Sequence, residues 1–529
     1  MRNFHFPGRS AVYAKQAMCA TSHPLASQSA IDILKQGGNA VDAALAASAV
    51  LAVVEPHMTG IGGDCFALLH KPGHALIGLS GVGRAPQAAS VDWHVDNNMT
   101  EIMQTSPHAV TIPGAIDAWC RLSTDHGRLP LSRVFKDAID YARNGFPVAP
   151  RIAWDWKRFS KKLSVHQKTK AAYLPNGKPP DVGDILMFPE LADTLQAIAE
   201  RGRDAFYAGP IAQDMVETLK SLGGQHVLGD FLVQKSDYVS PIKAAYGELD
   251  IYELPPSNQG ITALMMFQML SRLQDRGSEP VCAKRYHVMM EVARLAYSAR
   301  NHFLSDPDAM EVSHEYLISD ELADQLAARI DPEQRVPDLG AIPTPNKSDT
   351  VYLAVVDKDG MAISFINSLY SAFGSAITAP KSGVLLHCRG YGFRFTPGHA
   401  NSIGSRKRPM HTLLPAMAFK NRKPALVFGV MGADFQPTGH IQVITNILDY
   451  GLDPQQALDS PRVFFKDNVL SVEEGIPASV VTELEAMGHQ VERCVEEPWG
   501  GGQLIAIDDK TGALIGASDP RKDGIALGY

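Results

Sequence analysis

At 529 residues the chain is long for one hydrophobic core, so its length favours two domains or one large layered domain. It is 45% hydrophobic and 20% charged, as in ordinary soluble proteins, and a net charge of -8 offers no basic surface for nucleic acid. The longest apolar run, residues 41–54, contains Asp42 and is shorter than the roughly 20 residues of a membrane span. We therefore expect neither nucleic-acid nor membrane partners.

The chain also carries no sign of an export signal or a metal site. Its first residues, MRNFHFPGRSAVYAKQ, include no apolar stretch, which favours a cytoplasmic location. The six cysteines are scattered without a CxxC pair, and no His/Asp cluster has the spacing of metal ligands. We expect no metal and no disulfide framework.

The first two-thirds of the chain alternates helical and strand-like segments. Apolar spacing predicts helices over residues 24–36 and 41–54, followed by strands in CFALLH and HALIGLS around a Pro-Gly turn. Residues 128–330 are richer in helix, with amphipathic runs such as ELADTLQAIAERG and IAQDMVETLKSLGG. This alternation predicts helices packed against sheet.

Residues 331–349, DPEQRVPDLGAIPTPNKSD, break this pattern. They carry four prolines and no apolar period, which predicts an exposed loop. The segment that follows, TVYLAVVDKDGMAISFINSLY, alternates around Asp-Lys-Asp-Gly and predicts a β-hairpin. A long loop thus leads directly into a paired strand that starts with Thr350.

Thr350 is the nucleophile that the sequence can supply. No serine stands in a G-x-S-x-G motif, and His314-Glu315 lacks the second histidine of a zinc hydrolase. A threonine hydroxyl is a poor nucleophile, but a free α-amino group on the same residue, with a pKa of about 7.7 to 8, can take its proton. Thr350 would gain that group by attacking the carbonyl before it. β-Propensity alone also explains a threonine at a strand start, so both interpretations stay open.

The segment from Asp349 to Gly360, DTVYLAVVDKDG, resembles the self-cleavage and nucleophile segment of the γ-glutamyltransferase family. Other blocks resemble that family in the same order, and together they cover about residues 20–529: GGNAVDAALAASAVLAVVEP, IGGDCFALL, FGSAITAPKSGVLL, KRPMHTLLPAM, ILDYGLDPQQALDSPR and GASDPRKDG. The resemblance implies an α+β fold, the four-layer αββα sandwich of N-terminal-nucleophile hydrolases, in which two sheets lie between helices.

The resemblance further implies cleavage between Asp349 and Thr350. The products would be a large subunit, residues 1–349, and a small subunit, residues 350–529, that share one core. A dimer of such pairs is compatible with this scheme. The implied chemistry uses no cofactor.

The catalytic roles follow from the same resemblance. Thr350 matches the nucleophile, and Ser368 matches a second hydroxyl that hydrogen-bonds to it. Gly432 and Ala433 match the pair whose backbone N–H groups form the oxyanion hole, where the family prefers Gly-Gly. Because the donor is a backbone group, Ala433 can serve wherever its backbone adopts the required conformation.

The chain departs from the family where γ-glutamyl enzymes hold the substrate's α-amino and α-carboxylate groups. Tyr370 replaces an asparagine, Gly392 replaces an aspartate, His411-Thr412 replaces a Ser-Ser pair, and Val82 replaces an arginine. A desolvated ammonium without a partner costs several kcal/mol. These departures therefore predict weak binding of a free α-amino group.

Cationic groups remain for a substrate carboxylate. Arg84 and Arg389, with His411, are the candidates, because an arginine fork matches a carboxylate geometrically. Arg389 and Arg394 are equally compatible with a solvated surface. The expected substrate site consists of Arg84, Tyr370, Arg389, His411 and Thr412.

The departures are similar to a branch of the family that includes oxamate amidohydrolase and the cephalosporin acylases. The sequence thus predicts a self-processing amidohydrolase that acts on a small carboxylate-bearing amide through an acyl-Thr350 ester. One alternative is a true γ-glutamyltransferase acting on glutathione, in which Tyr370, His411 and Thr412 rebuild the pocket. Another is a binding protein that has kept the fold and lost the activity.

Overall fold

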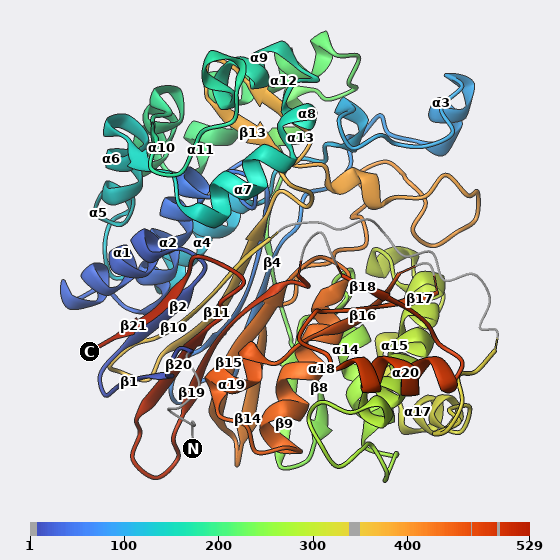
Figure 1. The fold of residues 1–529 in the computed structure, drawn as a ribbon. Coiled ribbons are helices and arrows are strands. Elements are labelled where there is room, and N and C mark those ends of the chain that lie inside the picture. Colours follow the sequence, from blue (N-terminus) through green and yellow to red (C-terminus); the bar gives the residue numbers. More distant parts are fainter. Residues whose placement is uncertain (1–7, 338–349, 467, 495–497) are drawn as a thin grey trace.

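Two stacked sheets form the centre of the molecule, and the computed structural model describes residues 8–337, 350–466, 468–494 and 498–529 (Figure 1). Both sheets have seven strands, and all neighbouring strands in them are antiparallel. The first sheet, in spatial order, contains β21 (Ile525–Gly528), β2 (Met18–Thr21), β10 (Val351–Val356), β11 (Ala362–Ser368), β3 (Asp64–His70), β4 (Ile77–Gly81) and β7 (Asp237–Val239). The second contains β1 (Val12–Ala14), β20 (Leu514–Ser518), β19 (Gly501–Ile507), β15 (Lys423–Met431), β14 (Ala416–Lys420), β9 (Leu249–Glu253) and β8 (Ile242–Tyr246).

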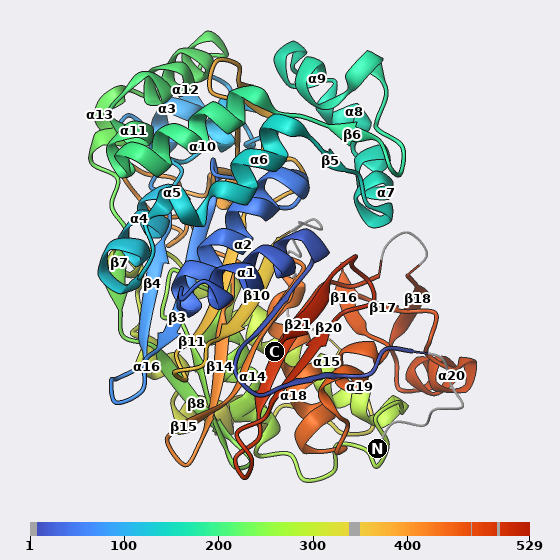
Figure 2. The same ribbon diagram turned by 90° about the vertical axis from the view of Figure 1, so that its left-hand side faces the viewer.

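Helices cover the outer face of each sheet, as Figures 1 and 2 show. The first sheet is covered by α1 (Pro24–Lys35), α2 (Ala40–Val54) and α4 (Ala115–His126). The second is covered by α14 (Gly260–Leu270) and α18 (Phe435–Leu448), and α15 (Ala283–Phe303) packs on α14. Helix α2 is apolar on all sides, and all of its residues are buried because α6 (Lys136–Asn144) packs on its outer side. The predicted αββα order is confirmed.

The remaining elements include the helix-rich region predicted for residues 128–330. The helices are α3 (Val91–Asp96), α5 (Leu131–Val134), α7 (Pro150–Arg158), α8 (Ser160–Leu163), α9 (Gln167–Tyr173), α10 (Pro189–Arg201), α11 (Arg203–Tyr207), α12 (Pro210–Ser221), α13 (Leu228–Leu232), α16 (His314–Leu317), α17 (Asp320–Ala327), α19 (Pro454–Asp459) and α20 (Ala478–Ala486). The short strands are β5 (Phe146–Pro147), β6 (Ile185–Leu186), β12 (Ile377–Ala379), β13 (Val384–Leu386), β16 (Val463–Lys466), β17 (Val469–Val472) and β18 (Gln490–Arg493).

The predicted hairpin is present as β10 and β11, and its register positions the candidate nucleophile. Val351 pairs with Asn367, so Thr350, one residue earlier, stands opposite Ser368. On the other side of β11, Ser368 pairs with Asp64, the first residue of β3. Directly opposed residues present their side chains on the same face of a sheet. The ends of three strands therefore place Thr350, Ser368 and Asp64 in one row.

The two sheets approach closely beside this row. A Cβ atom on Gly429 of β15 would lie 2.4 Å from the ring of Tyr352 in β10, so only glycine fits there. The Tyr352 hydroxyl also lies 2.8 Å from Ser364 Oγ. The start of β10 is therefore packed against the strand that leads into Gly432.

The loop expected over residues 331–349 is described only in part. Residues 331–337 form no helix or strand, and Asp349 lies outside the described residues. The boundary between the two expected subunits stays a prediction. In the described part of the chain no helix is long and apolar enough to cross a membrane, and the cytoplasmic location also stays a prediction.

Candidate active site

Thr350 and Ser368 form a buried hydroxyl pair at the end of the hairpin. Both side chains are fully buried, and Thr350 Oγ1 lies 3.2 Å from Ser368 Oγ. The backbone N–H of Tyr370 donates a hydrogen bond to Ser368 Oγ at 2.8 Å. Ser368 Oγ accepts this bond, so the hydrogen bond between the two hydroxyls uses either the proton of Ser368 or the proton of Thr350. The geometry matches the pairing that the resemblance implies.

The turn after β15 contains the two expected oxyanion donors. Gly432 has φ 119° and Ala433 has φ 49°, so both adopt left-handed backbone conformations. For alanine this conformation costs about 1–2 kcal/mol. Hydrogen bonds from Phe435 to Gly432 O, at 2.9 Å, and from Gln436 to Ala433 O, at 3.2 Å, fix the turn. The N–H groups of Gly432 and Ala433 have no acceptor among the described residues, which leaves both able to bind an oxyanion.

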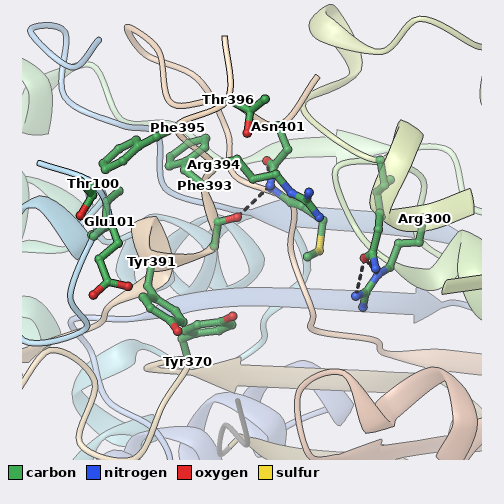
Figure 3. A pocket seen from close by; sticks show the side chains of 15 residues that line it. Thr100, Glu101, Arg300, Tyr370, Tyr391, Phe393, Arg394, Phe395, Thr396 and Asn401 are labelled. Carbon is green, nitrogen blue, oxygen red and sulfur yellow. Dashed lines mark hydrogen bonds between the residues drawn. The ribbon is translucent and has the colours of Figure 1, made fainter. Parts of the chain in front are cut away.

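A cavity of about 410 Å³ reaches the segment that follows Ser368, although neither Thr350 nor Ser368 lines it (Figure 3). Tyr370 forms part of its wall, and the backbone of the same residue contacts Ser368. The other lining residues that bear on recognition are Glu101, Arg300, Tyr391, Gly392 and Arg394. The cavity is thus the candidate substrate site, and it has charged groups of both signs in its wall.

Arg394 is the cation of this cavity that is available to a ligand. No described residue forms an ion pair with its half-buried guanidinium. Burial, and then the nearby Arg300, lower the pKa of Arg394 from its ordinary value, although an arginine stays charged. Arg300 already has partners within the protein, because its guanidinium pairs with the carboxylate of Asp434 and donates a hydrogen bond to Gln259 Oε1 at 2.6 Å. Arg394 thus lines the cavity and remains partly exposed, so its solvated-surface interpretation stays open.

Arg389 is fully buried behind the cavity wall and does not line the cavity. Its guanidinium carbon lies 4.1 Å from the centroid of the Tyr370 ring, and its Nη1 donates to Thr412 Oγ1 at 2.8 Å. Its Nε and Nη2 atoms have no partner among the described residues. Arg389 thus supports Tyr370 from behind, and its burial makes the solvated-surface interpretation of Arg389 wrong. Its expected contact with a substrate carboxylate, and the place of Thr412 in the substrate site, stay predictions.

His411 is also fully buried, against Asp64. Its Nε2 atom lies 3.0 Å from Asp64 Oδ2, and its Nδ1 accepts the N–H of Leu413 at 3.3 Å. Burial, followed by the charge of Arg389, lowers the pKa of His411 to about 3, so the ring is neutral and donates to the carboxylate. Asp64 also accepts the N–H of Gly83 at 3.0 Å. Sequence reasoning missed Asp64, whose place at a strand end after Gly-Gly was its available signal.

Arg84 does not line the cavity. Its Nη1 lies 3.7 Å from Asp306 Oδ2 and donates to the backbone oxygen of Arg406 at 3.0 Å. Its charge is therefore already paired, and nothing in its position supports the expected contact with a substrate.

A family model for gamma-glutamyltranspeptidase matches residues 26–529. The chain belongs to the γ-glutamyltranspeptidase family. It is therefore an N-terminal-nucleophile enzyme acting on amide bonds by hydrolysis or transfer. The third interpretation of the sequence, an inactive binding protein, is set aside.

Relatives of this γ-glutamyltranspeptidase-family enzyme agree with the branch that the sequence resembles. It is 37% identical over 531 residues to the glutathione hydrolase-like YwrD proenzyme of Bacillus subtilis, covering 98% of this chain and 99% of that one. It is 32% identical over 525 residues to the oxamate amidohydrolase proenzyme of Klebsiella pneumoniae, covering 97% and 98%. The crystal structure of cephalosporin acylase from Bacillus halodurans matches with a TM-score of 0.93 at 36% identity, covering 100% and 99%.

The buried histidine His226 predicts that acid lowers the stability of this enzyme. Burial lowers the pKa of His226 to about 4, from an ordinary value of 6.5. Below about pH 6.5 His226 is protonated in the unfolded chain but stays neutral in the folded chain. The free energy of unfolding therefore falls as the pH drops toward 4. The loss for His226 is at most about 3 kcal/mol. We expect a lower melting temperature at about pH 5 than at about pH 7.5, and a smaller difference in His226→Gln. Equal melting temperatures of the wild type at both pH values would contradict this.

Proposed function

We propose that the chain is a self-processing amidohydrolase that cuts itself between Asp349 and Thr350 and then hydrolyses small carboxylate-bearing amides through an acyl-Thr350 ester. The observation that carries the proposal is the 3.2 Å distance between Thr350 Oγ1 and Ser368 Oγ. Thr350 stands one residue before β10. Both curated relatives described above are named proenzymes, which supports processing.

Processing and turnover use the same hydroxyl. In processing, Thr350 Oγ1 attacks the carbonyl carbon of Asp349, and the hydroxyl proton passes to the nitrogen as the peptide C–N bond breaks, which leaves an ester and a free α-amino group on Thr350. Water then hydrolyses the ester, which releases the Asp349 carboxylate and restores the Thr350 hydroxyl. In turnover, that amino group takes the hydroxyl proton while the oxygen attacks the substrate amide. The N–H groups of Gly432 and Ala433 stabilise the oxyanion, and the amine departs with a proton. Water then hydrolyses the acyl-Thr350 ester to the acid.

The substrate class rests on Arg394. A half-buried guanidinium binds a carboxylate more strongly than an exposed one, because less water competes for it, and its two parallel N–H groups match the carboxylate fork. The relative named oxamate amidohydrolase carries in its name an amide that bears a carboxylate. We infer that Arg394 holds the carboxylate while the amide faces Thr350.

Hydrolysis of γ-glutamyl compounds such as glutathione is the second candidate function. One observation favours it: Glu101 brings an exposed carboxylate to the cavity wall, where it could pair with a substrate ammonium. The name of the relative called glutathione hydrolase-like points in the same direction. The two functions differ in whether the cavity binds or disfavours a substrate that carries an α-amino group.

Purified protein is expected to contain two fragments that remain associated. β10 of the small fragment pairs with β2 of the large one, so the fragments share a sheet after cleavage. Intact-mass measurement and N-terminal sequencing should give a new N-terminus reading Thr-Val-Tyr-Leu. A fully active protein that stays a single 57.3 kDa chain would remove the proposed mechanism.

A further inference from the structure

Gln259 joins three segments around the oxyanion turn with one buried side chain. It lies between β9 and α14 and is fully buried. Its Nε2 donates to the backbone oxygens of Thr412 and Ala433, both at 2.9 Å. Its own N–H donates to the backbone oxygen of His411 at 2.8 Å. Gln259 thus ties the first 349 residues of the chain to two segments of the remainder.

The amide of Gln259 is polarised by a charged neighbour. Its Oε1 accepts a hydrogen bond from Arg300 Nη1 at 2.6 Å, and the same guanidinium pairs with the carboxylate of Asp434. A charged donor on the amide oxygen strengthens the N–H donors at the other end of the amide. Arg300 also lines the substrate cavity, as Figure 3 shows. The network therefore runs from the cavity wall to the turn.

The turn needs such support because Ala433 is held in a left-handed conformation that alanine rarely adopts. The Gly432 carbonyl and the Ala433 N–H belong to one planar peptide, so they point in opposite directions. The N–H of Phe435 holds that carbonyl, and the side chain of Gln259 and the N–H of Gln436 together hold the carbonyl of Ala433. Because the peptide groups before and after Ala433 are both held, the direction of the Ala433 N–H is fixed.

We propose that Gln259, braced by Arg300 and Asp434, is a positioning residue that aims the Ala433 N–H at the oxyanion. The proposal rests on the proposed function, since the turn matters to the rate only if an acyl-Thr350 ester forms. Aiming an oxyanion donor acts on the transition state more than on substrate binding. Loss of Gln259 should therefore lower kcat and leave KM nearly unchanged.

The test compares Gln259→Leu with Gln442→Leu. Gln442 is a matched control: it is buried and its Nε2 donates to the backbone oxygen of Val463 at 2.7 Å, away from the turn. Processing is checked by mass and folding by melting temperature, and kcat and KM are then measured on a glutaryl anilide. We expect kcat of Gln259→Leu to fall roughly 10- to 100-fold with KM within about threefold, and Gln442→Leu to keep its kcat.

If Gln259→Leu does not fold, a second variant, Gln259→Glu, provides the test. A glutamate keeps the contact with Arg300, but it can donate to the Ala433 carbonyl only while protonated. The ratio of wild-type to variant kcat should therefore rise with pH, whereas a merely loosened structure gives a constant ratio. An unchanged kcat in Gln259→Leu, an equal fall in Gln442→Leu, or a constant ratio for Gln259→Glu overturns the role of Gln259. An unprocessed or inactive wild type would instead overturn the proposed function.

Discussion

Replacing Thr350 with alanine is expected to abolish self-cleavage and to lower amide hydrolysis by roughly 10⁴-fold or more, because one hydroxyl performs both attacks. Thr350 Oγ1 lies 3.2 Å from Ser368 Oγ at the end of the hairpin. Gel analysis and intact mass report the cleavage, and release of aniline from an anilide substrate reports the turnover.

Two further variants serve as controls for Thr350→Ala. Thr350→Ser should retain some of both activities, since it keeps a hydroxyl at the same position. Ser368→Ala should fold and keep part of the rate, because Ser368 assists the nucleophile through one hydrogen bond. Normal processing at the same bond in Thr350→Ala, with normal turnover, would place the nucleophile elsewhere.

The wild type is expected to hydrolyse a glutaryl anilide about 10- to 100-fold better, in kcat/KM, than the matching γ-glutamyl anilide. The two compounds differ only in the α-amino group, and an unpaired ammonium in the cavity costs roughly 1–3 kcal/mol. The reason lies at Gly392, which lines the cavity where γ-glutamyl enzymes are expected to present an aspartate. Measuring both specificity constants tests the prediction.

The variants for this comparison act on different parts of the cavity. Gly392→Asp should lower the ratio of kcat/KM for the glutaryl anilide to that for the γ-glutamyl anilide. A Cβ atom at position 392 fits, because it would meet only Met410 O, at 3.7 Å. Arg394→Gln should weaken both substrates alike, because both carry the carboxylate. Glu101→Gln should leave the ratio unchanged. A wild-type preference for the γ-glutamyl anilide that Glu101→Gln removes would establish the second candidate function, with Glu101 as the ammonium partner.

The hairpin could be predicted from the local sequence pattern, whereas the Thr350–Ser368 contact was implied by the family resemblance. The short turn over Asp-Lys-Asp-Gly joins β10 directly to β11, so the pairing of these two strands depends on residues that are close in sequence. The layer order could be predicted through the resemblance, and residues 24–54 had the helical period expected of a helix pair. These features depend on neighbours in sequence.

The substrate cavity could not be predicted in the same way. Arg389 and Arg394 lie in an irregular segment with no period to say which side chain is buried, and the structure puts the first behind Tyr370 and the second in the cavity wall. Arg84 looked available because its partner, Asp306, is remote in sequence. Gln259 has no motif at all. Each of these depends on contacts between distant segments, which composition and spacing do not encode.

The order of strands also determines how the enzyme would behave after denaturation. In the first sheet β10 and β11 lie between β2 and β3, and in the second β20, β19, β15 and β14 lie between β1 and β9, so segments from either side of residue 350 are interleaved in both sheets. If the bond before Thr350 is cut as proposed, neither fragment can dissociate without breaking the strand pairing of both sheets, so we expect the two fragments to stay associated in the native state. Refolding then requires two separate chains to find each other, so thermal inactivation becomes a one-way process governed by the unfolding rate.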